Sequence, residues 1–93
     1  MADLTIDDFL PWVDHACEAT APDGQVTMTL VDAQPLPHAQ RDGGGFRLEF
    51  KGPAEPVLGQ SIMMVTGPAG THEIFLVPIA QDSSATRYEA IFY

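Results

Sequence analysis

The sequence is poor in cysteine and lacks long apolar runs. Its one cysteine, Cys17, excludes an intramolecular disulfide and favours a reducing compartment. The longest apolar run, residues 74–80, falls far short of the roughly 20 residues that a membrane-spanning helix needs. The N-terminal stretch MADLTIDDFL has neither a basic region nor a long apolar segment, so no secretory signal is visible. We therefore expect a cytoplasmic protein, or one incorporated into a particle assembled in the cytoplasm.

Basic residues are also scarce. Four lysines and arginines stand against 13 acidic residues, which gives a formal net charge of −9. A field of this sign repels phosphate backbones and anionic headgroups. We expect neither a nucleic-acid partner nor a membrane surface.

The chain length of 93 residues allows one domain, and 45% hydrophobic residues suffice for a core. A short helix is predicted at about residues 5–13, where Ile6, Phe9 and Leu10 recur at helical spacing. Pro11 interrupts it, because proline inside a helix clashes with the preceding turn. The helix can restart at Pro11 as a first helical residue.

Beyond this segment the pattern predicts strands. Residues 45–51 alternate most clearly, with Phe46, Leu48 and Phe50 on one face. A loop rich in proline and glycine is expected at 34–45. The six expected strands are residues 15–21, 25–33, 45–51, 61–67, 72–80 and 86–93. The predicted fold is all-β, a small antiparallel barrel or sandwich of about six strands with a short N-terminal helix, in a single domain, 1–93.

The last expected hairpin is apolar on both faces of its first strand. Ile74 and Leu76 share one face with Pro78, whereas Phe75, Val77 and Ile79 share the other. Both faces then need a cover. Two covers for the second face remain open: the N-terminal helix, which we favour, and a partner subunit. The interface candidates are Phe75, Val77, Ile79, Ile91, Tyr93 and Trp12.

Pro78 bears on the same strand. It has no N–H to donate to a ladder, so it suits an edge strand or a bulge. An apolar strand with an incomplete edge is either protected or used for strand addition.

Residues that commonly carry chemistry are few and scattered. His15 and Cys17 share a face if they lie on one strand, but a metal needs three or four ligands and no others are near in sequence. His38, in the expected loop, converges with His72 and Glu73 only if the loop folds over that end. These three are ligand candidates. We predict no catalytic residue, no metal and no cofactor.

Several longer motifs resemble a small bacterial domain family of unknown function. They are DFLPWV, FRLEFKGPAEPVLGQ, IFLVPIAQD and RYEAIFY, which extend over nearly the whole chain. Gly59 departs from the family pattern, where proline is expected, as do Met63 and Met64. The resemblance supports the fold and implies no catalytic residues. It also suggests a gene context near phage-tail-collar-like proteins.

Together these features predict a non-enzymatic interaction or assembly module that binds a protein partner or forms a homo-oligomer. An accessory of a phage-tail-like particle is the most concrete form. The alternative is a small-molecule-binding β-barrel capped by the 34–45 loop. A strict monomer with no co-purifying protein counts against the first, and a bound small molecule favours the second.

Overall fold

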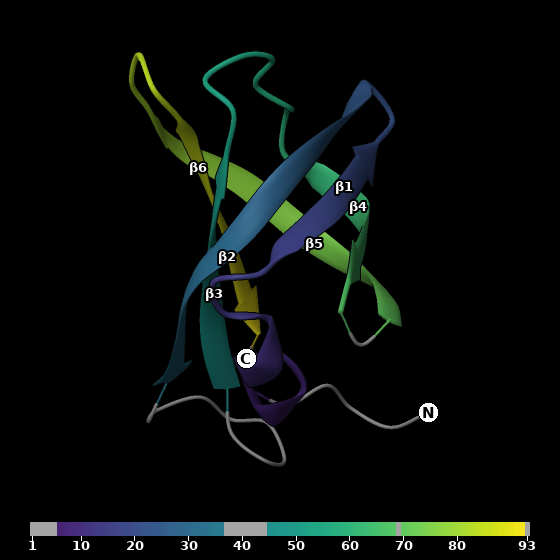
Figure 1. The fold of residues 1–93 in the computed structure, drawn as a ribbon, viewed down its shortest axis with the longest axis vertical. Helices are drawn as coiled ribbons and strands as arrows, with labels where there is room; N and C mark the ends of the chain where they lie inside the picture. Colours follow the sequence, from purple (N-terminus) through teal and green to yellow (C-terminus); the bar gives the residue numbers. More distant parts are fainter. Residues whose placement is uncertain (1–5, 37–44, 69, 93) are drawn as a thin grey trace.

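Six antiparallel strands form a closed barrel in a computed structural model of the chain, which describes residues 6–36, 45–68 and 70–92 (Figure 1). The strands are β1 (Ala16–Ala21), β2 (Gly24–Leu36), β3 (Gly45–Gly52), β4 (Ser61–Gly67), β5 (Gly70–Gln81) and β6 (Thr86–Phe92). Around the barrel they follow the order β1-β2-β3-β6-β5-β4, and β4 returns to β1 through three residue pairs centred on Ala19↔Val65. The predicted all-β antiparallel fold is confirmed.

The strands are longer in places than the sequence pattern suggested. β2 continues to Leu36, because residues 34–36 pair with residues 45–47 of β3. That pairing takes residues 34–36 and Gly45 out of the expected 34–45 loop. Residues 37–44, with His38, lie outside the described part of the chain, as does Tyr93, which the prediction placed in the last strand.

The short N-terminal helix predicted at about residues 5–13 consists of two 3₁₀ turns, η1 (Ile6–Asp8) and η2 (Leu10–Trp12), and the second turn contains Pro11, where a restart was predicted. Their hydrogen bonds span three residues: the Phe9 N–H donates to the Ile6 carbonyl at 3.0 Å, and the Trp12 N–H to the Phe9 carbonyl at 2.9 Å. Pro11 lies in the first turn of η2, where its missing N–H has no consequence. Among the described residues, no helix is long and apolar enough to cross a membrane.

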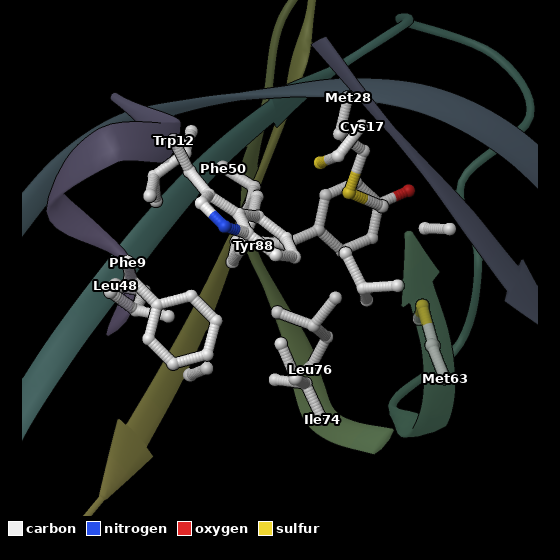
Figure 2. Close-up of a cluster of buried hydrophobic side chains, with 14 of the residues drawn as sticks. Phe9, Trp12, Cys17, Met28, Leu48, Phe50, Met63, Ile74, Leu76 and Tyr88 are labelled. Carbon is white, nitrogen blue, oxygen red and sulfur yellow. The ribbon is translucent and has the colours of Figure 1, made fainter. Parts of the chain in front are cut away.

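These turns close one end of the barrel. They do not cover the outer face of the last hairpin, although we had favoured them as its cover. Phe9 and Trp12 are completely buried, with their rings edge to face at 5.2 Å (Figure 2). Phe9 also contacts Phe46 and Phe92, whose own rings stack at 4.4 Å. The open end of a small barrel buries two large aromatic side chains more completely than an outer face does, and burial of that surface drives the placement.

The barrel interior is filled by side chains from every strand. Its largest fully buried members are Trp12, Tyr88, Phe9, Phe46, Phe50, Met28, Leu30, Leu48, Leu58, Met63, Ile74 and Leu76. Tyr88 crosses the interior, and its hydroxyl accepts a hydrogen bond of 2.9 Å from the backbone N–H of Leu58 in the β3–β4 connection. A barrel of this size has room only for its own side chains.

β5 and β6 are joined at one end of the barrel and separate toward the other (Figure 1). Residues 70–76 of β5 pair with β4, and only residues 77–81 include pairs with β6. Pro78 pairs with Tyr88 beside a register shift at Ile79, which is the kind of position that suits proline. The half of β5 that precedes Val77 therefore has a strand on one side only within the described chain.

Candidate docking surface

The outer face of β4 and β5 carries large apolar side chains exposed to solvent. Ile62 on β4 is directly opposite Phe75 on β5, and they are 61% and 52% exposed. Met64 and Ile79 extend the same face, at 44% and 45% exposed, with half-buried Val77 between Phe75 and Ile79. We call these five residues the β4–β5 patch. A contiguous apolar group of this kind on a small domain marks an interaction site more often than isolated exposed residues do.

The alternation of β5 explains how the patch arises. Ile74 and Leu76 point into the barrel and are at most 1% exposed, so Phe75 and Val77 must face outward. Two adjacent strands with apolar residues on both faces therefore fill the core and leave a second apolar surface outside.

Charge is distributed unevenly around the barrel. β1, β4 and β5 contain no lysine or arginine, and their charged residues are Glu18 and Glu73. Glu73 is exposed and is opposite Met64, at the margin of the patch. The described basic residues all lie on β3 and β6, namely Arg47, Lys51 and Arg87. The patch therefore lies on an acidic half of the barrel.

The two described arginines, Arg47 and Arg87, bind carboxylates on the outer face of β3 and β6. Arg47 donates to Glu89 at 2.7 Å and to Glu49 at 3.2 Å, and Arg87 donates to Glu49 at 2.7 Å. The hydrogen bond to Glu89 is the main reason that the pKa of Arg47 is raised. Desolvation alone would raise the pKa of Glu49, but the hydrogen bonds from the two arginines outweigh it and lower that pKa. The charges of Arg47 and Arg87 are therefore offset by carboxylates on the same face.

The structure places the interface candidates in three different settings. Phe75, Val77 and Ile79 belong to the patch. Ile91 is 43% exposed on the outer face of β6, across the opening between β5 and β6. Trp12 is completely buried, so it offers no surface to a partner, and Tyr93 lies outside the described residues.

The ligand candidates are not brought together by the described residues. His72 packs against the aromatic rings of Phe9 and Trp12, with centroid separations of 5.5 and 5.8 Å. Glu73 is the next residue of β5 and is exposed on the outer face, because successive side chains of a strand point to opposite faces. His38 lies outside the described part of the chain, so its relation to them stays a prediction.

His15 and Cys17 do not form a pair. Cys17 is buried on β1, and desolvation, with a contribution from Glu18, raises the pKa of its thiol to about 11. His15 is exposed and precedes the strand. Among the described residues there is no group of three or more His, Cys, Asp or Glu side chains that could hold a metal ion. A protonated, buried thiol is a poor nucleophile and a poor ligand.

Sequence reasoning missed Ile62 and Met64 as members of the surface. The run Ser61–Gly67 has apolar residues at consecutive positions 62–65, which already indicated that both faces of this strand are apolar. What the pattern did not show is that β4 is beside β5, so that the two outer apolar rows adjoin.

A protein-family model matches residues 4–92 of the chain. No curated protein and no solved structure matches it. The function must therefore be argued from the surface itself.

Proposed function

The chain belongs to the family described as "Domain of unknown function (DUF6916)", and from this premise we propose that it is a non-enzymatic interaction or assembly module. The expected resemblance to a small domain of unknown function is confirmed in that form. The bacterial origin and the phage-tail-like context are part of the proposal. In its most concrete version the module is an accessory of a phage-tail-like particle that is assembled in the cytoplasm.

The observation that carries this proposal is the uncovered β4–β5 patch. Ile62 and Phe75 form a directly opposed pair that is more than half exposed, although the same two strands also supply the core. Because these side chains are already partly buried, covering the rest of their surface stabilises a complex by about 1–2 kcal/mol each on transfer grounds, before the cost of association. A protein partner, or a second copy of the chain, gains this energy by docking there.

The small-molecule-binding alternative gains no support from the barrel interior. Twelve large side chains are fully buried in the core, and they include Phe9 and Trp12 at the end where a ligand would have to enter. The expected cap, residues 37–44, lies outside the described chain. No observation therefore favours this reading over docking at the outer face.

Site-specific crosslinking tests the proposed function. A photoreactive amino acid at position 75 is compared with one at position 57, where Val57 is 39% exposed in the β3–β4 connection. In extracts of the native cells, we expect a discrete crosslinked protein from position 75 and none from position 57. Light scattering at several concentrations shows in parallel whether that protein is a second copy. A strict monomer that yields no discrete product from position 75 would refute the proposal.

A further inference from the structure

β5 is apolar on both faces over much of its length, and only its inner face is covered. Ile74 and Leu76 fill the core, whereas Phe75 and Ile79 stay about half exposed. Strands that are apolar on both faces occur mainly in sheets whose outer face is covered by helices. The helical segments of the described chain are η1 and η2, and they close the end of the barrel. The described chain therefore supplies no helix for the outer face of β5.

The β4–β5 patch is a narrow stripe that follows β5. Its members extend from Met64, which is opposite Glu73, to Ile79. Residues 73–79 cover about 20 Å of strand, and paired strands such as β4 and β5 are about 4.8 Å apart. An α-helix of about 13 residues has the same length, and its diameter of about 10 Å spans both strands. A single helix is therefore large enough to cover the stripe.

Polar residues border the stripe on both sides. On the β1 side, Met64 is opposite Thr20. On the β6 side, Val77 is opposite Glu89, which binds Arg47 at 2.7 Å. A broad apolar surface would also desolvate these polar groups, and that desolvation costs free energy. The stripe therefore favours a narrow partner such as one helix.

The carboxylates near the stripe have no cation of their own. Glu73 and Glu18 are exposed on the outer faces of β5 and β1. Glu18 accepts hydrogen bonds from Thr27 at 2.8 Å and from Gln25 at 3.2 Å, and neither donor carries a charge. Within the part of the chain that the structure describes, neither carboxylate forms an ion pair with a lysine or arginine. A basic partner is therefore attracted to this face.

The same charges disfavour a second copy as the cover. Two chains with a formal charge of −9 repel one another. A symmetric contact through the patch would also place the same acidic face against itself. β1, β4 and β5 contain no lysine or arginine that could offset this repulsion. A helix with lysine or arginine beside its apolar face has the charge that a second copy lacks.

We propose that the β4–β5 patch binds a basic amphipathic helix of a partner protein. The helix lies along β5, with its apolar face on Ile62 and Phe75 and its basic residues beside Glu73 and Glu18. This inference rests on the proposed function and names the partner's chemistry. Binding covers a side-chain face and needs no pairing of backbones, as in other complexes that dock an amphipathic helix.

The test uses the full chain, labelled for NMR, and a synthetic peptide of about 14 residues. Its leucines are spaced three and four residues apart, with lysine and alanine elsewhere, so that one face of the helix is apolar. We expect amide shifts concentrated at residues 61–67 and 73–79. A peptide this short is only marginally helical alone, so circular dichroism of the mixture should show more helix than the two separate components. The affinity should fall at higher salt.

Two control peptides separate the apolar face from the charge. The first keeps the composition and distributes the leucines around the helix, so that no apolar face forms. The second keeps the leucine spacing and replaces lysine by glutamate. Neither control should gain helix in the mixture or shift the amides of residues 73–79.

Two matched pairs of variants locate the binding site. Ile62→Thr should weaken binding of the leucine–lysine peptide by about fivefold through lost apolar contact, whereas Ile91→Thr, on the outer face of β6, should change it less than about twofold. Glu73→Lys should weaken binding by about fivefold, from a lost attraction and a new repulsion. Glu55→Lys, in the exposed β3–β4 connection, should change it less than about twofold. Far-ultraviolet circular dichroism verifies that all four variants are folded.

Several outcomes overturn the proposal. Equal binding of the peptide with distributed leucines would show charge attraction without a helical contact face. Equal effects within either pair of variants would place the binding elsewhere. Concentration-dependent shifts at residues 73–79 without peptide would assign the patch to a second copy. A discrete crosslinked partner at position 75 with no response to the leucine–lysine peptide would leave the proposed function standing and remove the basic helix.

Discussion

Replacing Gly67 by alanine would push a methyl group into Trp12. An ideal Cβ at this position lies 2.5 Å from Cε3 of the indole and 2.7 Å from Cδ2, whereas carbon atoms in contact prefer about 3.5–4.0 Å. The indole or β4 must therefore move by about 1 Å. Overpacking of this kind costs about 1–3 kcal/mol. In an ordinary strand the same change is favourable by about 0.5–1 kcal/mol, so the sign of the effect is diagnostic.

Trp12→Ala gives the other half of the experiment. Removing a fully buried tryptophan costs about 3–5 kcal/mol, a large share of the roughly 5–14 kcal/mol expected for a domain of this length. With the indole gone, Gly67→Ala should no longer destabilise the protein. The double-mutant cycle should then yield a coupling of about 1–3 kcal/mol.

Urea unfolding at 25 °C, followed by far-ultraviolet circular dichroism, measures all four corners of the cycle. Trp12 is the one tryptophan of the chain, so its fluorescence separately reports a displaced indole in Gly67→Ala. Gly59→Ala is the matched control, since its nearest neighbour would be a carboxylate oxygen of Asp23 at 3.8 Å, an ordinary contact. Equal destabilisation by Gly67→Ala with and without the indole would refute the packing argument.

Three further predictions follow from single interactions. Tyr88→Phe leaves the buried N–H of Leu58 without its acceptor and should lower the free energy of unfolding by about 1–3 kcal/mol in urea titrations, with an unchanged circular dichroism spectrum. For Cys17, burial raises the folded-state pKa from 9.0 to about 11, so the thiol ionises first in the unfolded chain. The stability that the protonated thiol confers is complete below pH 9 and should be lost between about pH 9 and 11. Thermal melts across that range should show this dependence in the native chain and not in Cys17→Ala. Asp82 accepts hydrogen bonds from the backbone N–H and the hydroxyl of Ser84, and these bonds lower its pKa. The amides of the β5–β6 turn should therefore lose protection from hydrogen exchange as the pH falls through that lowered value. This loss should be seen in the native chain and not in Asp82→Asn.

Prediction from the sequence worked where a side chain's environment depends on its near neighbours along the chain. Period-two alternation identified Phe46, Leu48 and Phe50 as buried, and all three are at most 1% exposed. The same reasoning separated Ile74 from Phe75 on opposite faces of the last hairpin. A strand reverses the direction of its side chains at each residue, so these assignments need no knowledge of the rest of the fold.

The candidate surface was only half predictable. Phe75 and Ile79 were identified from the run 74–80, but Ile62 and Met64 joined them only because β4 is beside β5 in the barrel order. Trp12 was assigned to the surface and lies in the core. Its place depends on an open barrel end and on a glycine, Gly67, that is 55 residues away in the chain.

The sequence by itself determined the class of fold, the strong negative charge and the two apolar faces of the last hairpin, because composition and local alternation carry that information. The tertiary structure decided what covers each face. It turned Phe9 and Trp12 inward, left the outer face of Phe75 open, and ended the pairing of β5 with β6 at Val77. Those outcomes depend on strand order, barrel closure and contacts between distant residues, which no local pattern specifies.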